Sequence, residues 1–158
     1  ISILFGKMIA ANIISIFQLL IMFLFANLVF GLDIFSHLGG LLIMILATSF
    51  ACSAFGVLLA SFARSRQQVQ GLSTLIILVM SAIGGSMMPI FFMPAFMQKL
   101  AIMSVNYWSI QGFFDIFWRS LSFTDSTFLF RVLVLMLIGL ILNTLAVVMF
   151  KKNILNLN

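Results

Sequence analysis

The residues that could carry out chemistry are few in this chain of 158 residues, and they are widely spaced. There are three acidic residues and one histidine, His37, which stands in a short segment with Asp33. A metal site would need further ligands, and none is near these two, so we interpret His37 as a solvated loop residue. The acidic residues lie too far apart in the sequence to indicate a Ser–His–Asp arrangement.

The chain also lacks the glycine-rich loop that binds nucleotide phosphates. Gly6-Lys7 is followed by Met8 instead of Ser or Thr, and no glycine stands five residues before Gly6. We therefore expect no catalytic, metal-binding or cofactor-binding residue in this chain, and we expect that it is not an enzyme.

Uncharged polar residues inside long apolar windows are the more informative set. An unpaired amide in hydrocarbon is costly, so these side chains should face other helices or a wet cavity. Hydrogen bonding between helices and the lining of a transport pathway both remain open. If a pathway exists, its candidate lining residues are Asn12, Gln18, Ser81 and Asn143. No ionisable residue stands in the middle of a predicted span, which argues against a proton relay.

The composition explains why catalytic groups are so sparse. Apolar residues make up 64% of the chain and charged residues only 7%, whereas a soluble domain has roughly 25% charged residues. The mean hydropathy is +1.31. This chain cannot cover a water-facing surface, so we infer that its solvent is lipid. The net charge of +5 is spread singly or in pairs at the ends of apolar runs, which argues against nucleic-acid binding.

Four windows contain no Asp, Glu, Lys, Arg or His: 8–32, 38–63, 67–98 and 132–150. A helix of about 20 residues crosses the hydrocarbon core, and backbone groups in lipid must be paired internally. We therefore predict an all-α, polytopic membrane bundle in one transmembrane domain, 1–158. The predicted spans are about 8–30, 38–63, 70–86 and 131–150, with an external re-entrant or interfacial segment at 87–128. In the second span, Cys52, Gly56 and Ala60 have the small-residue spacing that allows helices to approach closely.

The third window is too long for one crossing and contains helix breakers. Gly84-Gly85, Pro89 and Pro94 argue against a continuous helix, since proline removes a backbone donor and clashes with the preceding turn. We expect the span to end near Gly84 or Ser86 and residues 87–100 to form a broken, partly re-entrant segment. The aromatic-rich stretch 101–118 is expected to form one or two short helices at the membrane face; the alternative is a fifth span.

The basic residues favour one orientation. With four spans, or with five, an inward N-terminus gives five basic residues inside and three outside, in the direction of the positive-inside rule. With four spans, the inside set is Lys7, Arg64, Arg66, Lys151 and Lys152, and the outside set is Lys99, Arg119 and Arg131. We expect both ends of this segment to be cytoplasmic.

The order of these features resembles the C-terminal two thirds of a type-2 ABC exporter permease. The resemblance rests on Gly6-Lys7, the polar turn 63–70, the break from Gly84-Gly85 through Pro89 to Met93-Pro94, the segment Asn106-Tyr107-Trp108 with Gly112, and the last span followed by Lys151-Lys152. One departure is the absence of a proline near Val105. The first two spans and the coupling helix of the family would precede Ile1, so we expect a piece of a longer protein.

This resemblance implies a mechanism and partners. Two permeases, identical or different, would pair in a bacterial cell membrane, each on an ATPase subunit that binds the ATP, and expel a substrate through the dimer seam. Gly84, Gly85, Pro89 and Pro94 would form an external lid. The contact with the ATPase would involve Lys7, Arg64, Arg66 and Gln67. The alternative, from another class, is a scaffold or assembly subunit without a pathway.

Overall fold

The computed structural model describes residues 2–62 and 65–155 of the chain. Its regular elements are α1 (Ser2–Phe30), η1 (Phe35–His37), α2 (Leu38–Phe62), α3 (Arg66–Ile83), η2 (Ile90–Phe92), α4 (Ala95–Ala101), α5 (Val105–Phe117) and α6 (Ser126–Leu155). No strand occurs within these ranges. The prediction of an all-α membrane bundle is therefore confirmed.

Three helical segments are long and apolar enough to cross a membrane: Phe5–Phe30, Phe35–Phe62 and Ser126–Lys152. The helix at the predicted third span, α3, has 18 residues, and its first turns carry Arg66, Gln67, Gln68 and Gln70. This polar start lowers its hydropathy relative to the other three. Residues 63–64, including Arg64, lie outside the described residues.

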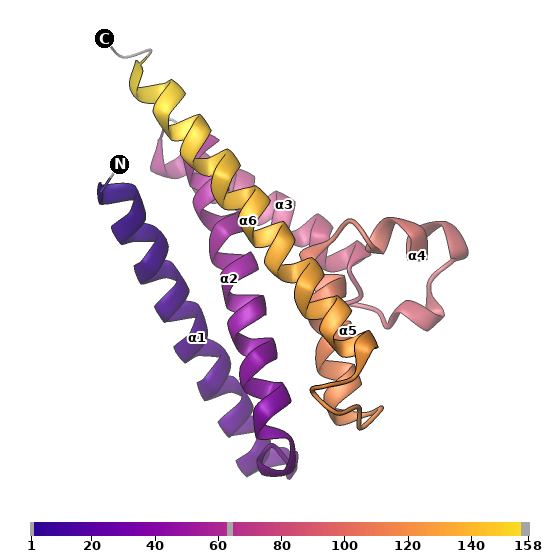
Figure 1. Ribbon diagram of the computed structural model, residues 1–158. Helices are drawn as coiled ribbons and strands as arrows, with labels where there is room; N and C mark the ends of the chain where they lie inside the picture. Colours follow the sequence, from indigo (N-terminus) through magenta and orange to yellow (C-terminus); the bar gives the residue numbers. More distant parts are fainter. Residues whose placement is uncertain (1, 63–64, 156–158) are drawn as a thin grey trace.

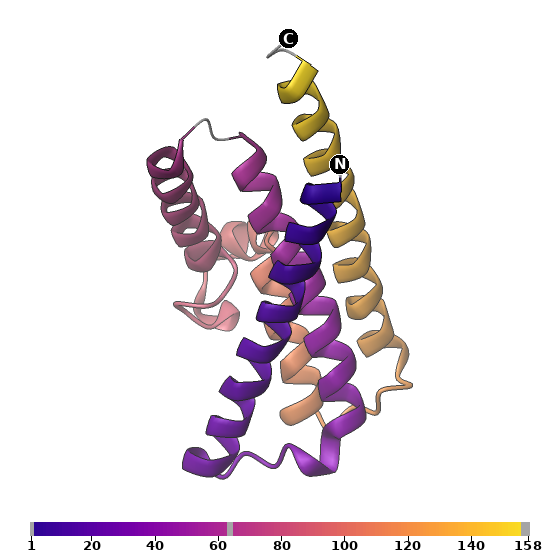
Figure 2. The same ribbon diagram turned by 90° about the vertical axis from the view of Figure 1, so that its left-hand side faces the viewer.

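The central helix of the bundle is α2, which packs against α1, α5 and α6. Both termini lie at the same end of the bundle, and α5 occupies the half that lies away from them (Figures 1 and 2). Helix α3 stands apart from α2 in the half near the termini (Figure 2), and α4 projects sideways (Figure 1). The break between α3 and α5 therefore lies about midway along the bundle.

Local residues define the ends of the helices. Gly31 ends α1 in a left-handed conformation with φ of 67°, which glycine adopts without a Cβ penalty. Asn27 donates from Nδ2 to the Leu32 carbonyl at 2.6 Å and closes this turn. Ser65 caps α3 by accepting from the Gln68 N–H, and Asp125 accepts from the Thr127 N–H at the start of α6.

Close helix contacts form where a glycine faces a large side chain. A Cβ added at Gly139 of α6 would overlap the ring of Phe50 on α2, and one at Gly112 of α5 would lie 2.5 Å from Met44. These contacts surround the main core. Its buried members are Met44, Ala47, Ala51, Val105, Ile116, Phe128 and Leu135.

The small-residue spacing at Cys52, Gly56 and Ala60 does not form such a contact within the described residues. All three residues are exposed, and no atom lies within 4 Å of a Cβ added at Gly56. The predicted close helix approach at this face is wrong for the chain by itself, because α2 buries its opposite face, which includes Ala47 and Ala51.

The segment expected at the membrane face is partly built into the bundle. At about 1.5 Å per residue, the 13 residues of α5 extend about 20 Å, which is short of a crossing. Gly112, Asp115 and Ile116 of α5 are buried, and Ile116 contacts α2 at Gly40. Helix α5 is thus a half-length helix packed on α2 and α6.

Candidate functional site

The break after α3 depends on the absence of side chains at two glycines. Gly84 is buried, and a Cβ there would lie 2.5 Å from Ser104 Oγ and 2.6 Å from the Met80 carbonyl oxygen. Gly85 has a φ of 90°, in the left-handed region that L side chains rarely adopt. The first glycine allows α3 and α5 to meet, and the second turns the chain away from the helix axis.

Hydrogen bonds join the two half-helices at this point. Asn106 donates from Nδ2 to Ser81 Oγ at 3.2 Å and to Ser86 Oγ at 3.0 Å. Ser104 donates to the carbonyl oxygen of Met80 at 3.2 Å, which also accepts from the Gly84 N–H in the last turn of α3. We call Ser81, Gly84, Ser86, Ser104 and Asn106 the junction. Of the predicted pathway residues, Ser81 belongs to it.

The two prolines shape the excursion between the glycines and α5. Pro89 directly precedes η2 and Pro94 directly precedes α4, where a missing N–H costs no helical hydrogen bond. Gln98 donates from Nε2 to the Met93 carbonyl at 2.8 Å and holds α4 against this turn. Gly84, Gly85, Pro89 and Pro94 thus all lie between α3 and α5, in residues 84–104, which we call the broken segment. Their role as a lid stays a prediction.

A buried ionic cluster lies beyond the break, and sequence reasoning missed it. Asp115 of α5 is fully buried, and its two carboxylate oxygens pair with Arg119 and with Arg131 of α6. The Arg131 side chain is 13% exposed and that of Arg119 is 50% exposed. The spacing of four residues between Asp115 and Arg119 was a readable signal for the first pair. The second pair joins residues 16 apart across a turn, and no local pattern reports it.

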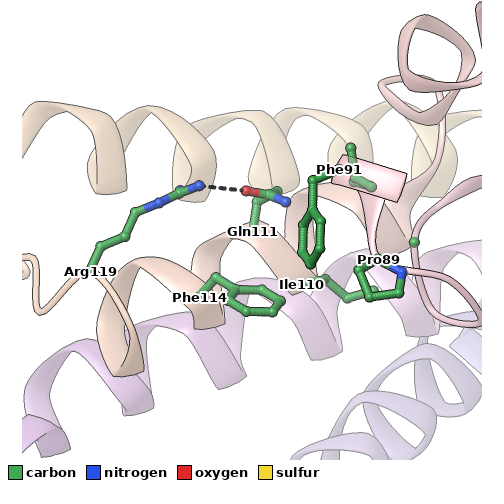
Figure 3. Close-up of a pocket in the computed structure, with 8 residues that line it drawn as sticks. Pro89, Phe91, Ile110, Gln111, Phe114 and Arg119 are labelled. Atoms are coloured by element: carbon green, nitrogen blue, oxygen red, sulfur yellow. Dashed lines mark hydrogen bonds between the residues drawn. The ribbon is translucent and has the colours of Figure 1, made fainter. Parts of the chain in front are cut away.

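A cavity of about 190 Å³ separates the broken segment from α5. Figure 3 shows Arg119 and Gln111 at one end of this cavity, with the rings of Phe91 and Phe114 and the side chain of Ile110 along it. Arg119 donates from Nη2 to Gln111 Oε1 at 3.2 Å. The cavity therefore has an apolar wall and a cationic end.

Two predicted pathway residues are brought together on another side of the molecule. Asn12 of α1 donates to Ser53 Oγ of α2 at 3.2 Å. Both side chains and Asn143 of α6 line a cavity of about 390 Å³. Gln18 lies elsewhere on α1 and is exposed. The structure thus places Asn12 with Asn143, and neither with Ser81 or Gln18.

Helix α3 exposes polar side chains along one side, beside large apolar ones. Gln67, Gln70, Thr74 and Ser81 line two adjoining grooves on this helix, and no residue of α3 is buried. The spacing of three, four and seven residues puts these polar side chains along one face.

The residues predicted to contact an ATPase lie at the end of the bundle that holds the termini. Lys7 stands in the second turn of α1, and Arg66 and Gln67 begin α3; all three side chains are exposed. Arg64 lies outside the described residues. Lys151 and Lys152, near the end of α6, are exposed at the same end.

Together these features define a multi-pass helical membrane protein with a broken helix midway along its bundle. The sequence model of the ABC-2 type transporter family matches residues 1–118. The chain belongs to this family, and it is a permease component of an ABC transporter. The match extends from α1 to the end of α5, so the whole broken segment is inside it. No curated protein and no solved structure matches the chain.

Proposed function

We propose that this chain is the membrane-spanning permease subunit of an ATP-driven exporter. It acts in a pair with a second permease, identical or related, and each permease sits on a separate ATPase subunit. ATP is bound and hydrolysed on that partner, and this chain holds no cofactor. The pair lies in a bacterial cell membrane, and both ends of this segment face the cytoplasm.

The observation that carries the proposal is the exposed polar face of α3. In lipid, each unpaired side-chain amide or hydroxyl costs about 1–3 kcal/mol. Gln67, Gln70 and Thr74 are exposed on one side of α3, next to Leu75 and Leu78. The exposed residues of α1 and α6 are mostly large and apolar. A wet pathway at the seam with a second permease would solvate these groups, which supports a transport role for α3.

The position of the break supports a gate at the end of this pathway. Irregular backbone at membrane depth is tolerated where it lines a cavity or is buried in protein. The junction lies midway along the bundle, where α3 ends and α5 begins (Figures 1 and 2). In the proposed cycle, the broken segment closes the outer end of the pathway and opens outward when the α3 helices separate.

The end of the bundle that holds the termini is the proposed site of the ATPase. It carries exposed Lys7 and Arg66 at the starts of α1 and α3, and Lys151 and Lys152 near the end of α6. This excess of basic residues fits a cytoplasmic face. Closure of the ATPases would push on Arg66 and Gln67 and so move α3 directly.

Cysteine accessibility in the full-length complex tests the proposal. In a background that carries Cys52→Ala, Thr74→Cys would be labelled by a water-soluble thiol reagent in proteoliposomes that contain the permease and its ATPase. Leu137→Cys is the matched control, because Leu137 is exposed on the apolar face of α6. We expect Thr74→Cys to be labelled at a rate that changes with ATP, while Leu137→Cys stays protected.

Protection of Thr74→Cys with and without ATP would overturn the pathway and favour the scaffold alternative. An active purified complex that contains no ATP-hydrolysing subunit would overturn the proposal as a whole.

A further inference from the structure

The cavity between the broken segment and α5 is cationic at one end and apolar elsewhere, and the proposed transport mechanism gives it no role. Its residues include one cation, Arg119, and no acidic side chain. The nearest carboxylate, Asp115, is fully buried, and each of its oxygens already pairs with an arginine. The cluster of one carboxylate and two guanidinium groups keeps one net positive charge.

Arg119 keeps donors for a ligand. A guanidinium group has five N–H donors, and the hydrogen bonds to Asp115 and Gln111 use one on each of the two terminal nitrogens. The side chain is half exposed, so the remaining donors are within reach of a molecule that enters the cavity.

The side-chain amide of Gln111 adds further N–H donors beside those of Arg119. Its Oε1 accepts from Arg119, so its amide nitrogen points the other way. Figure 3 shows this nitrogen on the side of Phe91, within the cavity. The end of the cavity near α5 therefore presents N–H groups and no unoccupied carboxylate, an arrangement that fits an anion.

The rest of the cavity is apolar. Pro89, Ile90, Phe91, Ile110 and Phe114 line it. Its volume of about 190 Å³ is below the range of roughly 300–1,000 Å³ that encloses a whole drug-sized ligand. A ligand would thus place only its charged end and the adjoining part inside. Phe91 is 73% exposed, so the remainder of the ligand would pass over its ring and out of the cavity.

We propose that this cavity binds an anionic amphiphile, with a carboxylate or phosphate head on Arg119 and Gln111 and an apolar chain that passes between Phe91 and Phe114. A cationic amphiphile would be repelled by the net positive charge of the cluster formed by Asp115, Arg119 and Arg131. A neutral one would form no charge-assisted hydrogen bond with the guanidinium group. Inorganic phosphate would accept hydrogen bonds from these donors, but it would make no contact with the apolar wall.

Photo-cross-linking tests this site in the full-length permease with its ATPase, in nanodiscs of phosphatidylcholine. The probe is palmitic acid with a diazirine group near its carboxylate, and labelled peptides are located by mass spectrometry. We expect labelling of the peptides that contain Phe91 and Phe114. Oleate should compete, and methyl oleate should compete at least about tenfold less well, as expected for the loss of one charge-assisted hydrogen bond.

Variants separate the charge from the fold. Arg119→Gln should reduce labelling about tenfold or more, and Arg119→Lys should retain part of it, because it keeps the charge. Lys99→Gln is the matched control: it removes an exposed cation of α4 that does not line the cavity, and labelling should not change. If Arg119→Gln does not fold, the comparison of oleate with methyl oleate on the unmodified chain still decides.

The competitors also distinguish the source of the anion. Competition by oleate alone indicates a free fatty acid, and competition by phosphatidic acid as well indicates a lipid headgroup; either supports the site. Equal competition by methyl oleate, or labelling unaffected by Arg119→Gln, would show general lipid contact and overturn the proposal. Competition by inorganic phosphate alone would overturn the role of the apolar wall.

Discussion

Replacement of Asp115 by Asn tests how far the buried ionic cluster stabilises the bundle. The substitution keeps the shape of the side chain and removes its charge. In the native chain the carboxylate pairs with Arg131 at the start of α6 and with Arg119, two residues beyond the end of α5. After the substitution both guanidinium groups remain without a negative partner.

The two pairs contribute unequally because their exposure differs. Asp115 is 0% exposed and Arg131 13% exposed, so this is a buried pair, and loss of one partner costs about 3–5 kcal/mol. Arg119 is 50% exposed, and a solvent-screened pair at this spacing is worth about 0.3–0.5 kcal/mol. An Asn oxygen can still accept one hydrogen bond, so we expect a loss of about 3 kcal/mol, nearly all of it through Arg131.

Thermal unfolding of the purified permease in detergent measures this loss. At about 2–4 °C per kcal/mol for a chain of this size, Tm should fall by about 6–12 °C. Asp125→Asn is the matched control, because Asn also caps a helix and should change stability by less than about 0.5 kcal/mol. The double variant D115N/R131Q should lose less than the sum of its single variants. A Tm for Asp115→Asn equal to that of Asp125→Asn would refute the reasoning.

Four further substitutions have expected outcomes that follow from local geometry. Gly139→Ala should destabilise the chain by about 1–3 kcal/mol in thermal unfolding because its Cβ meets α2, while Gly56→Ala, which meets no atom, should be neutral or stabilising. Gly84→Ala should raise amide exchange at the junction, because backbone and side chains of two segments crowd its Cβ position. The pKa of Asp33 is lowered, mainly by the hydroxyl of Ser36. At neutral pH, the Asp33→Ala variant should therefore show faster amide hydrogen exchange at the start of η1 than the native chain. This difference should vanish only as the pH falls through the lowered pKa of Asp33, below about 3.8.

The fold class and the broken segment could be predicted from the sequence because their causes are local. Composition determines the solvent, and long apolar windows in lipid must be helical. Gly84, Gly85, Pro89 and Pro94 act on their own backbone, so their effect needs no partner. Asn27 stands in the first apolar window, where a polar side chain is expected to face another helix or a cavity. It instead closes the turn after its own helix, because the Leu32 carbonyl lies within hydrogen-bond distance.

The features that the sequence did not reveal depend on which helix faces meet. Arg131 reaches Asp115 only because α6 returns beside α5 after a turn. Cys52 and Gly56 have the spacing of a packing face, but α2 buries the opposite side against α6. Spacing along a helix reports which residues share a face, and it does not report which face has a partner.

The two half-helices differ in how firmly the bundle holds them, and this difference suggests how force would travel. Helix α5 is held by Asp115 and by its buried residues against α2 and α6. Helix α3 has no buried residue, and the hydrogen bond between Ser81 and Asn106 ties its far end to α5. A push at Arg66 would therefore move α3 as a lever and reach the junction before it disturbs the bundle.

A pair of matched disulfides tests this lever, and the test rests on the proposed exporter function. Ser81→Cys with Asn106→Cys would lock the junction, and Asn12→Cys with Ser53→Cys would lock α1 to α2; both native pairs are joined by hydrogen bonds of 3.2 Å. In a chain with Cys52→Ala, oxidation of the first pair should abolish ATP-driven transport in proteoliposomes and reduction should restore it. The second pair should leave most transport intact, because α1 and α2 contact each other and the proposed movement of α3 does not separate them. Equal inhibition by both pairs would mean that the whole bundle moves, and full transport with the junction locked would mean that α3 does not act as a lever on the broken segment.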